Sequence, residues 1–302
     1  MFTIFSIPKP FRGNIGIIQR NAIQSWCRLR PACEIILFGE EEGTAAAATE
    51  FNIRYVPEVA RNEYGSPLFS SLFEQAHRYA THQLMAYVNA DIILMVDFAK
   101  AISQIRLDRF FMLGQRWDLD VTELLDFSNP DWESLLRSEV SKYGQLHPPS
   151  GADYYLFPQG LFGTIPPFAV GRTVMDNWLI YKARALDIPV IDATQVVTCV
   201  HQNHERTYAS VGLQSPQGEK SLTSGIEASK NVELMGGKDN AFSIEYATLL
   251  LTPQVLKPAL SPRHIYFRMR ALPVLHPRFH FLLAPFKIFE GLVRIARSVR
   301  TS

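Results

Sequence analysis

The stretch Leu84-Met-Ala-Tyr-Val-Asn-Ala-Asp-Ile-Ile-Leu94 is apolar and rich in β-branched residues, and it carries one carboxylate, that of Asp91. An apolar run of this length predicts a buried strand of an α/β sheet. A carboxylate late in such a strand is costly unless it has a partner, and open α/β sheets bind ligands at the C-terminal ends of their strands. We therefore interpret Asn89-Ala90-Asp91 as a candidate site. The alternative is a purely structural Asp91 that caps the following turn.

The chain before this stretch alternates between predicted strands and helices. Strands are expected over residues 2–7, 34–38 and 53–56. Helices are expected over residues 15–29, with Asn14 as the cap, over 44–51, and from Ser66-Pro67 to about 82, with Ser66 as the cap. This order predicts a mostly parallel sheet with a Rossmann-like first half.

The chain after this stretch is expected to complete the same domain. Strands are predicted over residues 109–114, 153–157, 188–191 and 196–200, and helices over 99–105 and 173–186. Residues 121–150 are interpreted as an insertion with an exposed amphipathic helix, and residues 202–240 as a polar, mobile loop or lid. The predicted fold class is an α/β, Rossmann-type mixed sheet flanked by helices, over residues 1–255.

Composition bounds the class of protein. The chain has 302 residues, of which 47% are hydrophobic, which suits one large α/β domain. A net charge of +1 gives no reason to expect a nucleic-acid partner. The spacing of Cys27, Cys33 and Cys199 fits neither a zinc site nor a disulfide framework, so we expect free thiols in a reducing cytosol. No signal peptide or membrane-spanning stretch is evident, which predicts a cytoplasmic protein.

The C-terminal residues 256–302 form a separate basic amphipathic extension. Residues 261–302 hold eight Lys and Arg residues against one acid, Glu290. Residues 283–299 have the composition of a basic amphipathic helix, which suits an anionic membrane surface or a membrane-bound partner. The alternative, a helix that packs on the domain with a solvated basic face, stays open.

Asn89-Ala90-Asp91 after an apolar strand resembles the Asp-X-Asp motif of nucleotide-sugar glycosyltransferases with the GT-A fold, of the family 2 type. The resemblance extends over about residues 2–205. In that family the last acid of the motif binds a divalent cation that holds the sugar-nucleotide diphosphate. The resemblance therefore implies that Asp91 is a ligand of Mn²⁺ or Mg²⁺. The chain departs from the pattern at Asn89, where an Asp is common.

The same resemblance places the start of the nucleotide pocket after the first strand. It implies roles there for Pro8, Lys9 and Arg12, because cationic donors suit phosphate oxygens. It also implies a donor contact for Ser66, at a helix N-terminus that favours anions. The alternatives are a solvated loop lysine for Lys9 and a simple cap for Ser66.

The resemblance further implies a general base at the start of the helix that follows the acceptor loop. Asp176 matches that position, and Trp178 is expected to stack on a sugar ring. Asp153 is the alternative base, and a helix N-terminal Asp favoured by the macrodipole is the structural alternative for Asp176.

A histidine just beyond a late strand resembles the additional metal ligand of many GT-A enzymes. His201 is therefore expected to share the metal with Asp91, and His204 is a weaker candidate; both could instead be surface histidines. Arg116, Trp117 and Asp118 follow another predicted strand and are placed on the acceptor side by position alone.

These residues and the resemblance together imply a metal-dependent glycosyltransferase of the hexosyltransferase type. Inversion is the first expectation for its mechanism, and retention stays open because one candidate carboxylate does not exclude it. The expected donor is a nucleotide-diphosphate sugar, with a UDP-sugar as first guess. The expected acceptor is a glycan or lipid-linked hydroxyl in polysaccharide or glycolipid assembly, with peripheral membrane contact through residues 261–302 at the inner face of the membrane.

Two alternatives stay open. A sugar nucleotidyltransferase should carry a Gly-rich basic loop after the first strand, and residues 8–13 hold only one Gly. An inactive membrane-associated scaffold with the same fold is favoured by Asn89. A dehydrogenase, an ATPase and a hydrolase lack their Gly-X-Gly-X-X-Gly, P-loop and Gly-X-Ser-X-Gly motifs.

Overall fold

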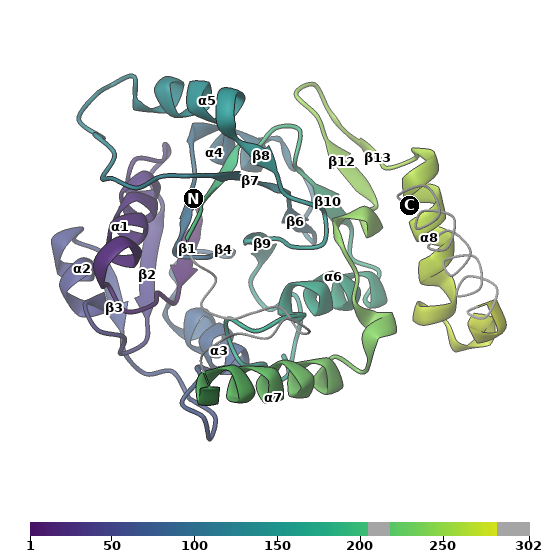
Figure 1. The fold of residues 1–302 in the computed structure, drawn as a ribbon. Coiled ribbons are helices and arrows are strands. Elements are labelled where there is room, and N and C mark those ends of the chain that lie inside the picture. Colours follow the sequence, from purple (N-terminus) through teal and green to yellow (C-terminus); the bar gives the residue numbers. More distant parts are fainter. Residues whose placement is uncertain (205–217, 283–302) are drawn as a thin grey trace, which may run out of the picture.

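The computed structural model describes residues 1–204 and 218–282, whose strands form a nine-stranded and a four-stranded sheet covered by helices (Figure 1). The large sheet has the spatial order β13 (Leu256–Pro258), β12 (Leu249–Leu251), β10 (Val190–Asp192), β6 (Phe111–Leu113), β9 (Tyr154–Pro158), β4 (Leu84–Val88), β1 (Thr3–Ser6), β2 (Glu34–Phe38) and β3 (Arg54–Val56). This arrangement confirms the predicted fold class.

Strand β9 runs against its neighbours in the middle of a sheet whose other strands are parallel, apart from the edge strand β13, which is antiparallel to β12. On one side β4, β1, β2 and β3 are mutually parallel, and on the other β6, β10 and β12 are. β9 is antiparallel to both β4 and β6. The start of β9 therefore lies at the same sheet edge as the end of β4, and Val88 pairs with Tyr154 there.

The small sheet has the order β5 (Ile92–Ile93), β11 (Cys199–Gln202), β7 (Arg116–Leu119) and β8 (Gln145–Leu146). The prediction of one strand over residues 84–94 is therefore wrong, because β4 and β5 belong to different sheets. The chain turns between them, and Ile92 N–H donates to the Asn89 carbonyl at 3.1 Å. Both halves are buried in hydrophobic clusters, so the apolar pattern does not reveal the break.

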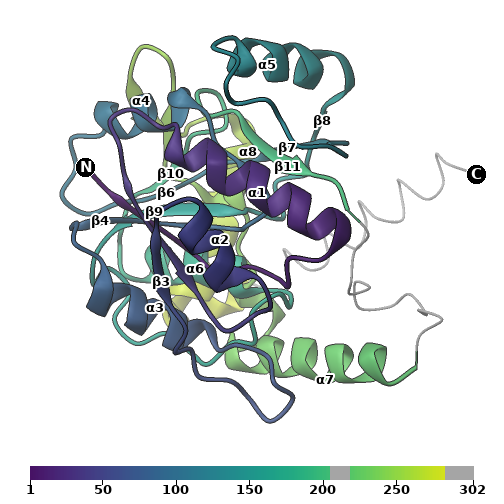
Figure 2. The ribbon, with the colours of Figure 1, turned by 90° about the vertical axis from the view of Figure 1, so that its left-hand side faces the viewer.

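Helices bury both faces of the large sheet (Figures 1 and 2). Neighbouring residues of β1 point to opposite faces, so Ile4 and Phe5 enter different clusters. Helices α1 and α4 line the cluster that contains Ile4, and α3 and α6 line the one that contains Phe5. The helices are α1 (Gly13–Cys27), α2 (Thr44–Glu50), α3 (Phe69–Tyr79), α4 (Val96–Gln104), α5 (Trp132–Tyr143), α6 (Met175–Ala185), α7 (Gly218–Leu234) and α8 (Pro262–Leu275), with short 3₁₀ turns η1 (Lys238–Asn240), η2 (Ile244–Tyr246) and η3 (Pro277–Leu282).

Two predicted helix caps are wrong. Helix α1 begins at Gly13 without a side-chain cap, so Asn14 lies inside the helix. Helix α3 begins at Phe69, with Leu68 in the capping position, so Ser66 lies in the preceding loop. In both places a residue of suitable type stands near a helix start, but the hydrogen bond that defines a cap is not made.

Of three longer predicted segments, the loop over 202–240 differs from expectation, whereas the insertion and the C-terminal extension stay predictions. The predicted loop over 202–240 contains helix α7, whose polar composition conceals it, while residues 205–217 lie outside the described residues. The insertion 121–150 is tied to the small sheet, because β8 pairs with β7 and α5 packs on that sheet's cluster. The predicted boundary at 255 falls inside the β12–β13 hairpin, and the helix predicted over 283–299 lies outside the described residues.

Trp26 joins the two sheets and is fully buried in α1, where its indole N–H donates to the Ile92 carbonyl at 2.9 Å. We expect Trp26→Ala to lower the free energy of unfolding by about 3–5 kcal/mol through cavity formation. Trp26→Phe, which retains most of the packing, should cost only about 1–2 kcal/mol through the lost hydrogen bond. Urea unfolding measures both, and equal losses would show that the hydrogen bond rather than packing dominates.

Candidate functional site

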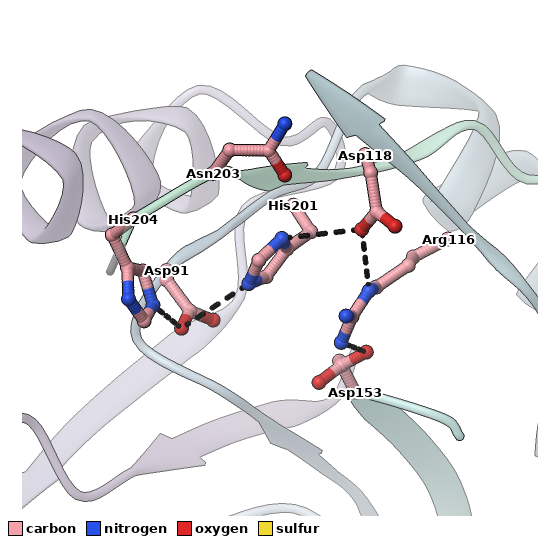
Figure 3. Close-up of a pocket in the computed structure, with 7 residues that line it drawn as sticks. All are labelled: Asp91, Arg116, Asp118, Asp153, His201, Asn203 and His204. Atoms are coloured by element: carbon pink, nitrogen blue, oxygen red, sulfur yellow. Dashed lines mark hydrogen bonds and ion pairs between the residues drawn. The ribbon is translucent and has the colours of Figure 1, made fainter. Parts of the chain in front are cut away.

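A cleft of about 310 Å³ lies where the edges of the two sheets meet (Figure 3). It is lined by Asp91, Arg116, Asp118, Asp153, His201, Asn203 and His204. Asp91 follows β4, and Asp153 directly precedes β9, so the antiparallel course of β9 brings the two carboxylates to one edge. β11 lies between β5 and β7, which sets His201 opposite both Ile92 and Asp118.

Asp91 lies between two imidazoles. Its Oδ2 is 3.0 Å from Nε2 of His204 and 3.8 Å from Nε2 of His201 (Figure 3). Oδ1 of Asp91 is buried and has no hydrogen-bond partner among residues 1–204 and 218–282. The candidate ligand atoms of the three residues all lie within 4.8 Å of one another. The site therefore combines converging oxygen and nitrogen donors with an orphaned buried oxygen.

The electrostatics of Asp91 favour its ionised form. Burial alone would raise the pKa of this carboxyl, but the hydrogen bond with His204 and the charges of His201 and Lys9 outweigh it. The pKa of Asp91 consequently lies well below its usual value. Burial lowers the pKa of His201, which favours the neutral imidazole that a metal requires.

Arg116 is held between two carboxylates on the other side of the cleft. Its Nε donates to Asp118 Oδ1 at 2.8 Å, and one of its terminal nitrogens donates to Asp153 Oδ2 at 2.6 Å (Figure 3). Asp118 also lies 3.2 Å from His201 Nδ1 and 2.7 Å from His147 Nδ1. Burial would raise the pKa of Asp118, but His147 and Arg116 lower it below its usual value. Asp118 thus links the arginine to a candidate metal ligand.

Asn89 has a structural reason to differ from the acid of the Asp-X-Asp pattern. Its side-chain amide donates to Asp153 Oδ1 at 2.7 Å, and its backbone N–H donates to the Asp153 carbonyl at 2.9 Å. An ionised Asp in this position would place two carboxylates in contact at a buried edge, which is unfavourable. Asn89 therefore orients Asp153 in this chain.

Asp176 lies at the start of α6, beside the cleft and not among the residues that line it. Its Oδ2 accepts a hydrogen bond from the backbone N–H of Ala152 at 3.3 Å, which places it next to Asp153. Burial raises the pKa of Asp176 from 3.8 to about 6, and the charge of Asp153 adds to this effect. Among the carboxyls discussed, this pKa is the one suited to a general base near neutral pH.

The structure places the other predicted residues differently. Pro8 is buried beside Lys9, which is half-buried and whose charge acts on Asp91. Arg12 is exposed and pairs with Glu42, and Ser66 lies 3.4 Å from an Arg172 nitrogen. These contacts give no sign of a phosphate role for either residue.

Trp178 is a core residue. Its side chain is 6% exposed and packs edge-on against Phe168, with the ring centroids 5.5 Å apart. A sugar can stack only on an accessible aromatic face, so the expected stacking role is incompatible with this placement.

Sequence reasoning missed His147 and Asn203 and ranked His204 too low. His147 lies in a breaker-rich loop, and only its contact with Asp118 marks it. Asn203 follows β11, and its amide donates to Asp120 Oδ1 at 2.8 Å. The spacing of His201 and His204 is the signal in the sequence that pointed to the two imidazoles. His204 lies closer to Asp91 than His201 does.

The described residues fit a divalent cation. One carboxylate and two imidazoles form a donor set that suits first-row transition metals, and the unpartnered Oδ1 of Asp91 offers a further oxygen. Asp118 Oδ1 lies 3.2 Å from the second nitrogen of His201, where outer carboxylates commonly stand at metal sites, although the two atoms are not aligned for a hydrogen bond.

No family model matches the chain. A search of curated proteins also finds no match. The similar solved structures include GT-A-type nucleotide-sugar glycosyltransferases. Glucosyl-3-phosphoglycerate synthase from Mycobacterium tuberculosis, in complex with Mn²⁺, UDP and glucosyl-3-phosphoglycerate, is 16% identical with a TM-score of 0.45, over 79% of this chain and 81% of that one.

Two further solved structures resemble the chain. The mannosyltransferase PcManGT from Pyrobaculum calidifontis, in complex with GDP-Man and Mn²⁺, is 14% identical with a TM-score of 0.43, over 94% of this chain and 83% of that one. The 4-diphosphocytidyl-2C-methyl-D-erythritolsynthase from Anaerococcus prevotii is 11% identical with a TM-score of 0.36, over 75% and 95%. Similarity at this level transfers neither activity nor residue roles.

The Arg116 network predicts a specific pattern of stability. Arg116→Met leaves two largely buried carboxylates facing each other and should cost about 3–5 kcal/mol in the free energy of unfolding. Adding Asp153→Asn removes one of these charges and should restore part of the loss. Denaturant unfolding at neutral pH measures both variants.

Arg20→Met is the matched control, because the Arg20–Glu50 pair lies at the surface and should be worth at most about 1 kcal/mol. Equal losses for Arg116→Met and Arg20→Met would contradict a special role for the cleft network.

Proposed function

We propose that the chain is a metal-dependent glycosyltransferase that transfers a hexose from a nucleotide-diphosphate sugar to a hydroxyl acceptor. The observation that carries the proposal is the orphaned, buried Oδ1 of an ionised Asp91 that lies between His201 and His204. Such a group holds a cation, and a cation at the C-terminal edge of an α/β sheet is suited to a diphosphate.

The proposed donor site consists of the Asp91 group and the loop after β1. Asp91, His201 and His204 would hold Mn²⁺ or Mg²⁺, which would supply the positive charge that stabilises the leaving diphosphate. The nitrogen ligands favour Mn²⁺ of the two. Lys9 acts electrostatically on Asp91 and would add a cationic contact to phosphate oxygens. A UDP-sugar remains the first guess for the donor.

Asp176 is the proposed general base of an inverting transfer. With a pKa of about 6 it is ionised at neutral pH and still accepts a proton readily. Asp153 is less available to an acceptor hydroxyl in this structure, because its two carboxylate oxygens already accept hydrogen bonds from Arg116 and Asn89. Asp153 and Arg116 would instead keep Asn89 and Asp118 in position along the cleft.

The acceptor and the location of the protein are further parts of the proposal. We propose a glycan or lipid-linked acceptor in polysaccharide or glycolipid assembly, at the cytoplasmic face of a membrane. Within residues 1–204 and 218–282, no helix combines the length and the apolar character needed to cross a bilayer.

Two other functions are separated by simple assays. A sugar nucleotidyltransferase would release pyrophosphate from a nucleoside triphosphate and a sugar phosphate, whereas the proposed enzyme releases a nucleoside diphosphate from its donor. A scaffold would do neither. The orphaned Oδ1 of Asp91 favours a functional site over a scaffold, since an unpaired buried carboxylate oxygen has a cost without structural benefit.

The first prediction of this proposal concerns donor binding. UDP, GDP, CDP or TDP should raise the melting temperature by several degrees when Mn²⁺ is present, because a ligand that binds only the native state stabilises it. Asp91→Asn should abolish the metal-dependent part of the shift. Differential scanning fluorimetry of each nucleotide with and without Mn²⁺ measures it.

Asp108→Asn is the matched control for this experiment, because Asp108 is exposed and lies outside the cleft. No shift with any of the four nucleotides would remove the donor-site proposal, and an equal shift in Asp91→Asn would remove Asp91 from it.

The second prediction concerns the base. The pKa of Asp176 is raised, so the residue becomes an active base as pH rises, and kcat/KM should increase through an apparent pKa of about 6. Asp176→Asn should lower kcat by at least about 100-fold and remove this limb from the residual activity. The pH profile of sugar transfer, or of donor hydrolysis, measures it.

The same shift has a consequence for folding. Native Asp176 retains its proton up to about pH 6, whereas the unfolded residue loses it near 3.8, so its contribution to stability decreases as pH rises across this window. Asp176→Asn should remove that decrease. Asp187→Asn, at the exposed far end of α6, is the control for both experiments. A limb near pH 6 that persists in Asp176→Asn and disappears in Asp153→Asn would assign the base to Asp153.

A further inference from the structure

Helix α8 carries an apolar stripe that the rest of the described structure leaves open. Ile265, Met269 and Leu272 are 45%, 53% and 38% exposed, and their spacing places them on one face of the helix. The opposite face is packed, since Ala271 is fully buried and Phe267 lies edge-on against Tyr246 at 4.9 Å. Figure 1 shows α8 at the outer edge of the molecule, beyond the β12–β13 hairpin.

The segment around this stripe is basic and has no acid of its own. Residues 256–282 contain no Asp or Glu, whereas they hold Lys257, Arg263, Arg268, Arg270 and Arg278. Arg268 is exposed, follows Ile265 by three positions and adjoins Met269. Burial lowers the pKa of Arg184 in α6, and the charge of Arg268 lowers it further. The two arginines therefore lie near each other on this side of the fold.

We propose that the exposed face of α8, formed by Ile265, Arg268, Met269 and Leu272, docks the protein on an anionic lipid bilayer. The apolar side chains would enter the boundary between headgroups and acyl chains, while the stem of Arg268 follows them and its guanidinium stays with lipid phosphates. The proposal extends the membrane association proposed above, and it does not depend on the donor site.

Charge argues against a second copy of the chain as the occupant. A two-fold contact would bring the same basic face against itself and set Arg268 against Arg268. In sequence, residues 283–302, which lie outside the described residues, are also basic, with Lys287, Arg294, Arg297 and Arg300 against Glu290. The basic composition therefore continues beyond α8, which suits an anionic bilayer.

Vesicle co-sedimentation of the full chain tests the proposal. The wild type should pellet with vesicles of phosphatidylcholine mixed with phosphatidylglycerol, less with phosphatidylcholine alone, and less as salt increases. The triple change Ile265→Gln, Met269→Gln and Leu272→Gln should weaken binding by at least about tenfold, through the loss of three apolar contacts. Arg268→Gln should weaken it by about fivefold.

Leu135→Gln on α5 and Arg109→Gln are the matched controls, because Leu135 is 55% exposed and Arg109 is an exposed arginine outside the segment. All of these positions are at the surface, so melting temperatures should be unchanged and should confirm folding. Stabilisation by nucleotide with Mn²⁺, measured on the same variants, reports the donor site separately.

Three results would overturn the inference. These are no binding of the wild type to anionic vesicles, equal binding by the triple variant, and binding that does not distinguish anionic from neutral lipid. Retention on immobilised polyglutamate without vesicle binding would assign the face to an acidic protein instead.

Discussion

The turn Asn89–Ala90–Asp91 is the constraint on which the rest of the site depends. At this point the chain leaves the large sheet and enters the small one, and the antiparallel β9 brings Asp153 alongside. Asn89 fastens the turn to Asp153 through a side-chain and a backbone hydrogen bond. Asp91 is thereby held at the junction of the two sheets, where the small sheet supplies the histidines. Neither sheet alone would bring these groups together.

Charge balance explains why this junction is suited to a cation. The guanidinium of Arg116 is bonded to Asp118 and Asp153, so its positive charge is neutralised by these two carboxylates. Asp91 contacts His204 and lies near His201, and burial favours the neutral form of His201. The ionised carboxylate of Asp91 therefore adds negative charge to this side of the cleft. A divalent cation would restore the balance, and a diphosphate would then find a positive site in place of a repulsive one.

The sequence predicted the order of strands and helices well because their apolar periods are regular and Gly and Pro punctuate them. It singled out Asp91 and His201 because each stands beside an apolar run, although His201 lies within β11; their metal role stays a prediction. It did not reveal the break between β4 and β5, since both halves are buried and an apolar pattern reports burial and not sheet membership. Helix α7 was missed because its buried residues include the polar Glu227 and Asn231, which pair with distant partners.

Site residues whose roles depend on contacts distant in sequence were the least predictable. Trp178 matched an expected position, but the packing of α6 turns it into the core. His147 had no local signal in the sequence, because only its contact with Asp118 of strand β7 connects it to the cleft. Residue type and spacing indicate which residues lie at the edge of the sheet. The direction of each side chain depends on how the helices pack on the sheet, which the sequence pattern does not report.

Helix α8 and the candidate base belong to one packed unit. Phe267 of α8 packs on Tyr246, which stacks on Phe242 with centroids 3.9 Å apart. The amide of Asn177, next to Asp176, donates to the Phe242 carbonyl at 2.8 Å. Aromatic packing and a buried hydrogen bond thus connect the face of α8 to the start of α6. A bilayer bound at α8 would therefore lie in a fixed orientation relative to Asp176, which is what transfer to a lipid-linked hydroxyl requires, since its acceptor cannot rotate freely to meet the base.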